Sequence, residues 1–379
     1  MALFVNPPKT SNGIHDFEFM MNVNLNVNQV ERTLVPEWYP QSGVQLTWPH
    51  AGTDWSYMLD EVTECYLRLA YEISKRTHLL VVVPESQTVK ALLEQKLPQT
   101  CLKNIIFFEC ATNDTWARDH SFLSVVGPSG IELLDYKFNG WGGKFEASLD
   151  NAINKKLHQS SILKGQYVDS LDFELEGGSI ESDGLGTLLT TAECLLNDNR
   201  NRHLDKTLIE ERLKRDFGVK RVLWLDHGFL KGDDTDSHID TLARLCPNHT
   251  IVYVQCSDVN DEHFEALQKM ELQLRSFVTP EGKPYRLLAL PMPDPVYDED
   301  GERLPATSAN YWVMDHAILF PIYDQKEHDL SAAAILQQAF PQHEIVGVDC
   351  RALIRQHGSL HCVTMQFPKG VLVMQEDLK

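Results

Sequence analysis

Several familiar signals are missing from this chain of 379 residues. The N-terminal stretch MALFVNPPKTSNG has no basic segment followed by an apolar one, so no secretory signal is visible. No apolar run approaches the roughly 20 residues that span a bilayer. The eight cysteines include no C-x-x-C pair, which disfavours a zinc site or a redox pair. These absences predict a soluble, cytoplasmic protein whose cysteines are mostly small buried hydrophobic residues.

Basic residues are also few relative to acidic ones. Lys and Arg number 34 against 54 Asp and Glu, which gives a formal net charge of −20. Nucleic acids and anionic membranes are bound through basic surfaces, so neither is an expected partner. A cationic substrate would be attracted, although an acidic surface also serves solubility alone. The sequence does not decide the oligomeric state, and a homo-oligomer is left open.

The signature motifs of common α/β enzymes are absent as well. No G-x-G-x-x-G opens a helix after a first strand, and there is no P-loop and no G-x-S-x-G elbow. The usual cofactor and nucleotide functions are therefore unsupported, and no cofactor is implied. No linker rich in Gly, Ser or Pro divides the chain, so residues 1–379 are expected to form one domain.

What the chain does contain is an alternation of strands and helices. Short apolar runs bounded by turn residues predict strands at HLLVVVP, NIIFFEC, SFLSVV, IELLDYKF, VKRVLWLD, TIVYVQC, YRLLALP, AILFPIY, EIVGVDC and LHCVTMQF. Asp183-Gly184 predicts a hairpin turn. Helical periodicity predicts helices from Asp54, a plausible N-cap, to Ile73, and near residues 145–157, 204–213, 264–274 and 330–339.

This alternation is by itself typical of a doubly wound parallel sheet. Three of the predicted strands end alike, at Cys110, Cys256 and Cys350, which hints at a repeated unit. The periodicity does not rule out a closed ring of such repeats. The fold class predicted from pattern alone is therefore a layered α/β fold.

The acidic stretch DDTDSHIDTLARL has an unusual spacing. If it is extended, residues 234, 236, 238 and 240 share one face, which gathers three carboxylates around His238. Such carboxylates repel one another unless a cation lies among them, or the stretch is simply a solvated acidic loop. One candidate cation is a hard metal bound by Asp234, Asp236 and His238, with hydrolysis by metal-bound water. The other is an organic cation.

A guanidinium group would need a particular set of side chains. Paired carboxylates bind its forked N–H groups, and an aromatic face such as Trp116 stacks on its plane. Its carbon requires a strong nucleophile such as a thiolate, and an imidazole would protonate the departing ammonia. Cys362 follows a Gly-Ser turn in RQHGSLHCVTMQFP, where it is either core filling or a nucleophile presented by a turn. Asp119 and Glu176 are further candidate acids. Alternatively, Asp119 forms a surface ion pair and Glu176 is a solvent-facing turn residue.

Taken together and in this order, several stretches resemble one family closely. They are TWARDHSF, FNGWGGK, LEGGSIESDGLGTLLTTAECLLNDNRN, DTDSHID and HGSLHCVTMQ, joined by VPEWYPQSGVQLTWPH and SANYWVMDHAILFPIYD. The chain is similar to the agmatine deiminase branch of the guanidine-modifying enzymes, which includes the bacterial type of peptidylarginine deiminase. The resemblance implies an α/β propeller (pentein) of five ββαβ-type blades with pseudo-fivefold symmetry and a central active site. It also implies metal-free hydrolysis through a covalent amidino-thioether on cysteine.

The resemblance further implies roles for single residues. Cys362 matches the nucleophile, and His238 matches the general acid/base of H-x-D. Asp240 and Asp119 match the carboxylates that bind the guanidinium nitrogens. Glu176 of E-G-G resembles the partner that orients the histidine or the substrate.

Two more positions match the substrate pocket, namely Trp116 and Asp234, and Asp234 would suit a distal amine. The chain departs from the family pattern at HGSL, where a glycine-rich run is common, and at Ser237. The resemblance therefore implies an enzyme that converts agmatine, a small cationic guanidine, to N-carbamoylputrescine and ammonia in putrescine biosynthesis. Peptidylarginine, free arginine or a methylated arginine is the alternative substrate. A metal-dependent hydrolase and a binding scaffold without turnover are alternatives of other classes.

Overall fold

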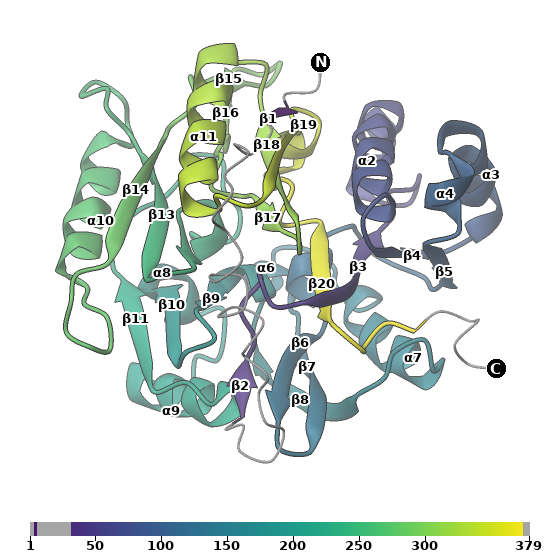
Figure 1. The fold of residues 1–379 in the computed structure, drawn as a ribbon, viewed down its shortest axis with the longest axis horizontal. Helices are drawn as coiled ribbons and strands as arrows, with labels where there is room; N and C mark the ends of the chain where they lie inside the picture. Colours follow the sequence, from purple (N-terminus) through teal and green to yellow (C-terminus); the bar gives the residue numbers. More distant parts are fainter. Residues whose placement is uncertain (1–3, 6–31, 374–379) are drawn as a thin grey trace.

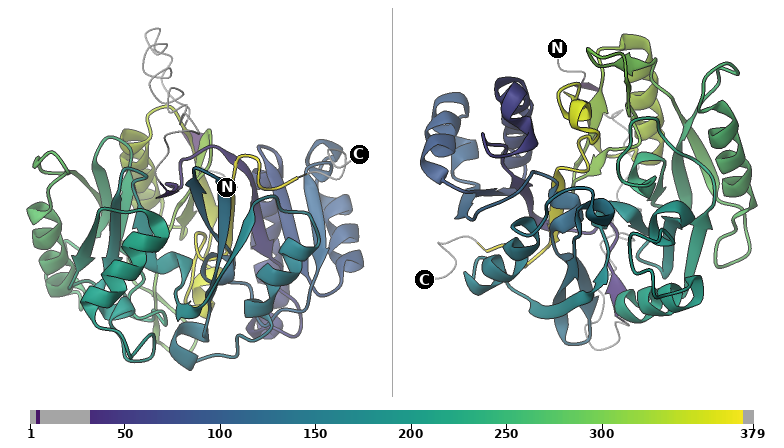
Figure 2. Two further views of the ribbon diagram at one scale, coloured as in Figure 1. Left: turned by 90° about the horizontal axis from the view of Figure 1, so that it is seen from below. Right: turned by 180° about the vertical axis from the view of Figure 1, so that it is seen from behind.

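The computed structural model describes residues 4–5 and 32–373 of the chain (Figure 1). The N-terminal stretch in which no secretory signal was found lies almost entirely outside these residues. The described part is a mixed α/β structure, as predicted. The long helices lie on the outside of the molecule, and the sheets lie between them and its middle (Figures 1 and 2). None of the described helices has the length and apolarity needed to cross a membrane.

The strands form several separate sheets and not the single sheet of a doubly wound fold. Three sheets have four strands each, ordered β2-β6-β7-β8, β20-β3-β4-β5 and β1-β19-β18-β17. Two have three strands each, ordered β9-β10-β11 and β12-β13-β14, and β15-β16 is a separate pair. In chain order the strands are β1 (Phe4–Val5), β2 (Thr33–Leu34), β3 (Gln41–Thr47), β4 (His78–Val83), β5 (Ile105–Glu109), β6 (Leu123–Gly127), β7 (Gly130–Lys137), β8 (Gln166–Glu174), β9 (Ile180–Ser182), β10 (Thr187–Thr191), β11 (Arg221–Leu225), β12 (Ala243–Cys246), β13 (Thr250–Gln255), β14 (Arg286–Pro291), β15 (Val296–Tyr297), β16 (Arg303–Leu304), β17 (Trp312–Val313), β18 (Ala317–Ile322), β19 (Glu344–Asp349) and β20 (Thr364–Pro368).

The larger sheets share one connection pattern. An antiparallel pair is followed by a parallel neighbour, as in β6, β7 and β8, in β9, β10 and β11, and in β12, β13 and β14. Two more sheets repeat this pattern. One contains β17, β18 and β19, and the other contains β20, β3 and β4. Antiparallel neighbours need only a turn, whereas parallel neighbours need a crossover, which a helix supplies here. The repeat expected from the sequence therefore exists in the connections.

The strands that end in cysteine do not mark that repeat. β5 and β19 are parallel strands that come after the antiparallel pair, whereas β13 belongs to such a pair. All ten apolar runs that were predicted as strands do contain strands, and Asp183-Gly184 does join β9 to β10. The similar strand endings arise by chance, because apolar strands resemble one another.

The helices agree with the predicted periodicity in most places. The longer ones are α2 (Leu59–Ser74), α3 (Ser86–Lys96), α7 (Ile153–Gln159), α9 (Lys206–Phe217), α10 (Phe264–Ser276) and α11 (Lys326–Ala339). Single-turn helices are α4 (Gln99–Leu102), α5 (Ala117–His120), α6 (Gly140–Gly143) and α8 (Ala192–Leu195), and 3₁₀ turns are η1 (Asp54–Met58), η2 (Asp150–Ala152), η3 (Gly177–Ser179), η4 (Ile239–Thr241) and η5 (Leu353–Gln356). Thr53 and not Asp54 stands before the first turn, and helix near residue 145 begins only at Asp150. These are shifts of boundary, where sequence patterns are weakest.

The last strand of the chain pairs with one of the first. β20 pairs antiparallel with β3, with Thr364 opposite Leu46, so a strand near the end of the chain lies beside one near its beginning (Figure 1). β3 also pairs parallel with β4, so it is held on both edges. The turn that precedes β20 carries Cys362, and its position is therefore fixed by this pairing.

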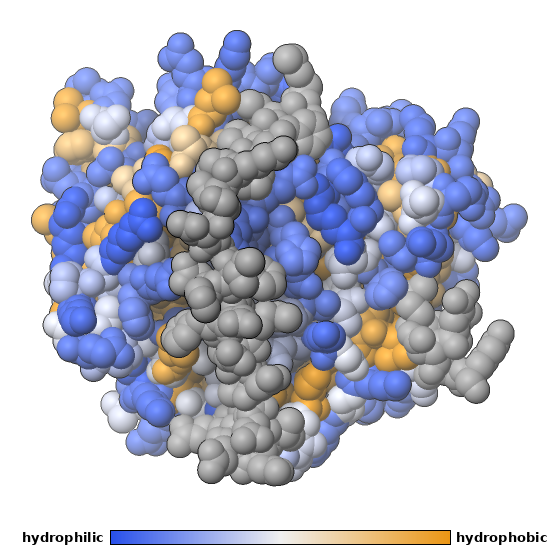
Figure 3. All heavy atoms as spheres, viewed as in Figure 1, coloured by the Kyte–Doolittle hydropathy of each residue, from blue (hydrophilic) through white to orange (hydrophobic). Residues whose placement is uncertain are grey.

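One face of the molecule is mainly polar. On the face shown in Figure 3, hydrophilic residues cover most of the described surface and apolar residues form only small groups. The apolar side chains are instead buried in several clusters, one of which contains Trp116, Trp141 and Cys362. The candidate nucleophile is thus part of a packed core.

Candidate active site

Cys362 lies in the turn immediately before β20 and is only 4% exposed. Asn310 holds this turn, because its side-chain oxygen accepts from the backbone N–H of His361 at 2.9 Å and of Cys362 at 3.4 Å. Its Nδ2 lies 3.4 Å from the sulfur. The backbone of Arg118 also donates to the carbonyl of Cys362 at 3.1 Å. The thiol is therefore held by groups from two other parts of the chain.

Two aspartates approach this thiol. Asp119, from α5, accepts hydrogen bonds from Trp141 Nε1 at 3.0 Å and from the backbone N–H of Gly178 at 2.9 Å. Asp240, from η4, places Oδ2 3.9 Å from the sulfur, while its Oδ1 is buried without a hydrogen-bond partner among the described residues. The structure thus brings together the two carboxylates that the sequence assigned to a guanidinium.

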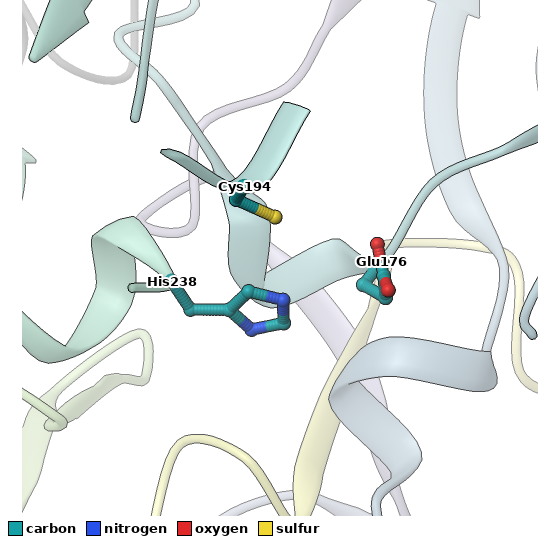
Figure 4. Close-up of side chains that lie close together, drawn as sticks. All are labelled: Glu176, Cys194 and His238. Atoms are coloured by element: carbon teal, nitrogen blue, oxygen red, sulfur yellow. The ribbon is translucent and has the colours of Figure 1, made fainter. Parts of the chain in front are cut away.

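His238 is completely buried beside them. Its Nδ1 lies 3.7 Å from Asp119 Oδ1, and neither ring nitrogen has a hydrogen-bond partner within residues 32–373. Glu176 lies close to this ring (Figure 4). Arg200 donates from Nε to Glu176 Oε1 at 2.7 Å, and Oε2 stays unpartnered in the described region. Unsatisfied buried polar atoms are costly, so their concentration here indicates a site that a polar ligand completes.

Burial and like charges set the protonation of this site. Burial raises the pKa of Asp119 well above its usual value, and the carboxylates of Asp240 and Glu176 add to the shift. Burial, Asp240 and Asp119 likewise raise the pKa of the Cys362 thiol well above its usual value. Burial lowers the pKa of His238 to about 3. Burial and the nearby charges thus disfavour the thiolate of Cys362, the imidazolium of His238 and the carboxylate form of Asp119 in the free protein.

Asp240 differs from Asp119. Burial would raise its pKa, but the hydrogen bond and charge of His361 outweigh burial and leave the pKa lowered. Asp240 is thus the carboxylate of the pair that ionises more readily. A cation placed between them favours ionisation of both, and of the nearby thiol, because it offsets the repulsion that raises their pKa values.

The acidic stretch is not extended, and the prediction that residues 234, 236, 238 and 240 share one face is wrong. Asp236 and Ser237 both have left-handed backbones, with φ of 63° and 64°, so the chain turns between Asp234 and His238. Asp236 accepts from Arg200 at 2.6 Å and from Lys144 at 2.8 Å. These contacts direct Asp236 away from the face that His238 occupies.

Asp234 lies at the edge of the site. Its side chain is 41% exposed, and its Oδ2 lies 3.8 Å from Nε2 of His357. The metal centre of Asp234, Asp236 and His238 is therefore not formed. Within the described residues, the one group with ligand spacing consists of Glu176, Cys194 and His238.

Trp116 belongs to the same buried cluster as Cys362. It is buried and packs against Trp55 and Trp141, with ring centroids 5.7 Å and 6.2 Å away. A Cβ atom on Gly358 would come within 2.1 Å of the Trp116 ring, so this position of HGSL admits only glycine. Ser237 is the other position that departs from the family pattern, and its Oγ donates a hydrogen bond to Glu193 at 3.1 Å. Neither departure removes a reactive group.

Several residues of the site were missed in the sequence, and His361 is the clearest. Its Nδ1 lies 2.7 Å from Asp240 Oδ2 and its Nε2 lies 2.5 Å from Glu37 Oε2. Arg244 also binds Glu37, at 3.0 Å, and pairs with Glu181. An imidazole directly before the candidate nucleophile was a visible signal, but its partners come from distant parts of the chain. His361 is a positioning residue, because it orients Asp240 so that Oδ1 is left free.

Replacement of His361 by Phe should impair the site through Asp240. Two hydrogen bonds to carboxylates are lost, each worth about 1.5–3 kcal/mol, so we expect kcat/KM to fall about 10- to 100-fold. Without the imidazole the pKa of Asp240 rises, so the fall of kcat/KM with acidification should begin at a higher pH. The measurement is a pH profile of the turnover of a guanidine.

His361→Asn is the matched control, because its amide keeps a donor close to the position of Nδ1. The Asn variant should recover part of the lost kcat/KM. The acidic limb of its pH profile should shift back toward that of the wild type. A loss of thermal stability with an unchanged pH profile in both variants would show that His361 serves only the core.

Comparisons with known proteins give matches over most of the chain. Residues 33–368 match the model of the Porphyromonas-type peptidyl-arginine deiminase family. A putative agmatine deiminase of Marinomonas sp. is 32% identical over 353 residues, which cover 87% of this chain and 92% of that protein. A solved putative arginine deiminase of Porphyromonas gingivalis is 48% identical, with a TM-score of 0.86 over 90% of this chain and 100% of that one. A cysteine-to-serine agmatine deiminase of C. jejuni with substrate bound is 41% identical, with a TM-score of 0.82 over 89% of this chain and 97% of that one.

Proposed function

Because the chain belongs to the Porphyromonas-type peptidyl-arginine deiminase family, we propose that it is an agmatine deiminase. It hydrolyses the guanidinium group of agmatine to the ureido group of N-carbamoylputrescine and releases ammonia. The observation that carries this proposal is the convergence of a thiol, two aspartates and a free imidazole in one buried site. A planar cation with forked N–H groups completes such a site.

The aspartates bind the substrate in this proposal, and the bound substrate activates the nucleophile. Asp119 and Asp240 hold the guanidinium N–H groups, with Asp240 Oδ1 available for that purpose. The bound positive charge lowers the pKa of the Cys362 thiol relative to the free protein, and His238 accepts its proton. Substrate binding therefore creates the thiolate, and the resting protein keeps a less reactive thiol.

The reaction then proceeds in two halves. Cys362 Sγ attacks the central carbon, a C–S bond forms, and His238 returns its proton to the departing nitrogen, which leaves as ammonia. A water molecule, deprotonated by His238, attacks the amidino-thioether carbon. The C–S bond breaks, the sulfur leaves as thiolate, and the ureido product forms. Glu176 orients the imidazole through both halves, and Arg200 fixes the carboxylate.

The charges around the site favour agmatine over free arginine. An α-carboxylate would need a free cation, yet the buried arginines of the site are already paired with acids. Arg118 lies 3.5 Å from Glu37, Arg200 binds Glu176 and Asp236, and Arg244 binds Glu37 and Glu181. Asp234, half-exposed at the edge, suits the distal ammonium of agmatine.

Turnover of three guanidines tests this proposal. We expect agmatine to give ureido product and ammonia at a kcat/KM at least about 100-fold above that of free arginine, because arginine brings a carboxylate into an acidic site. A blocked arginine peptide tests the runner-up function of a peptidylarginine deiminase. Ureido product is measured colorimetrically. Preference for either arginine substrate would overturn the substrate assignment, and no ammonia from any guanidine would indicate a binding scaffold.

We propose the finer features of the fold on the same basis. The five larger sheets, with their shared connection pattern, are the blades of a pentein propeller with the site at its centre. The whole chain is one catalytic domain, since the site takes residues from Glu37 to Cys362. All eight cysteines are free in the structure, which supports a reducing compartment such as the cytoplasm.

A further inference from the structure

Cys194 is a buried thiol that the proposed reaction does not use. It lies on α8, in the stretch TTAECLLNDNRN, and its side chain is completely buried. Its sulfur, a carboxylate oxygen of Glu176 and a ring nitrogen of His238 all lie within 4.8 Å of one another. Figure 4 shows the three side chains side by side, brought from three separate segments of the chain. A thiol, an imidazole and a carboxylate are the ligand types of zinc sites.

A second observation points to a ligand at this place. Both nitrogens of His238 and Oε2 of Glu176 are buried without a hydrogen-bond partner in the described part of the chain. Arg200 holds the other oxygen of Glu176 at 2.7 Å, so the free oxygen is oriented and not merely loose. Metal-binding carboxylates are commonly oriented by such a hydrogen bond from a neighbouring group.

We propose that Glu176, Cys194 and His238 form an inhibitory site for a thiophilic divalent cation of the Zn²⁺ type. The inhibition rests on the proposed function, because the metal occupies the imidazole that moves protons in the reaction. It also places two positive charges beside the pair of aspartates that bind the cationic substrate. Zn²⁺ with three protein ligands accepts water as its fourth, so the site needs no further side chain.

The charges of the site suit such an ion. A thiolate and a carboxylate neutralise a dication, and Arg200 is already balanced by Asp236 at 2.6 Å. The proton of Cys194 is released to solvent when the metal binds. Cys194, and not the nucleophile Cys362, supplies the sulfur, because the sulfur of Cys194 lies with Glu176 and His238, whereas that of Cys362 lies beside Asn310 and Asp240.

Cobalt tests the binding directly, with no need for turnover. Co²⁺ added to the full-length Cys362→Ser protein should give a near-ultraviolet thiolate-to-cobalt charge-transfer band, because Cys194 remains. The double variant Cys362→Ser/Cys194→Ser should lack the band. Cys194→Ala in the same Cys362→Ser background should also lack it. Melting curves confirm that each protein is folded. A band that disappears in Cys362→Ser and persists in Cys194→Ser would overturn the proposal, as would the absence of a band from both single variants.

Inhibition is measured separately. Zn²⁺ should inhibit the wild-type enzyme, a chelator should restore the rate, and Cys194→Ser should need at least about tenfold more Zn²⁺ relative to its own metal-free rate. Cys101→Ser, which alters a buried thiol of α4, is the matched control and should be inhibited like the wild type. Equal sensitivity of Cys194→Ser would contradict the proposal. A cobalt band in a protein that turns over no guanidine would refute the proposed function and leave the metal site standing.

Discussion

Cys362→Ser should abolish the turnover of agmatine, with kcat reduced by at least about 10³-fold, while the fold stays intact. A hydroxyl in this site is a far weaker nucleophile than a thiolate, and the substrate cation cannot ionise it near neutral pH. The substitution removes no hydrogen bond that holds the turn, because Asn310 binds the backbone there. The measurements are ureido product over time and the melting temperature with and without agmatine.

The two aspartates remain in this variant, so agmatine should still raise its melting temperature. Cys101→Ser should keep full activity. A haloacetamidine, which presents an amidine cation with a leaving group, should label Cys362 ahead of the other seven cysteines. Substantial turnover by Cys362→Ser, or labelling of a different side chain, would refute the covalent mechanism.

Asp119→Asn should lower kcat/KM by roughly 10²- to 10⁴-fold, which corresponds to the 3–5 kcal/mol typical of breaking a buried charge pair. Burial, Asp240 and Glu176 raise the pKa of Asp119 in the free protein and so favour its protonated form. An amide is close to a protonated carboxyl in shape, so the empty site should tolerate the change. The loss arises when the guanidinium arrives, because the amide cannot supply the second negative charge. The substrate cation, whose charge favours ionisation of Cys362, is then bound less tightly as well.

Asp150→Asn is a matched control for this prediction. Asp150 is also buried, but its oxygens accept backbone N–H groups of Asn113 and Asp114 at 2.7 Å and 3.0 Å, away from the thiol. Its replacement should lower the melting temperature and leave kcat/KM nearly unchanged. A near-normal kcat/KM for Asp119→Asn, or an equal effect of both substitutions, would mean that Asp119 does not bind the guanidinium.

The regular elements could be predicted because their cause is local. Apolar runs between turn residues predicted the strands, and the buried face of α2 follows from helical spacing. Their assembly into separate sheets could not be predicted from alternation, since a doubly wound sheet has the same local pattern. Resemblance to the family, carried by long motifs, supplied that information instead.

The parts of the site that lie within recognisable sequence motifs could be predicted. Cys362, His238, Asp119 and Asp240 do converge on one place, as the motifs implied. The course of the acidic stretch was not predictable, because Ser237 N–H bonds Asp233 and Asp236 pairs with Arg200 and Lys144. Those contacts stabilise left-handed backbones at two residues that are not glycine, and such contacts are invisible in a local pattern. Asn310 and Glu37 were missed for the same reason.

The pairing of β20 with β3 has a consequence for biosynthesis. A ribosome makes β3 more than 300 residues before β20, since 364 − 47 = 317. Until then β3 has only β4 beside it, and its other edge awaits a partner that is not yet translated. The turn before β20 carries Cys362, the nucleophile of the proposed mechanism, so a nascent chain lacks this thiol while its other sheets assemble. On that mechanism a chain becomes active only when its last sheet is complete, and prematurely terminated products should not turn over guanidines.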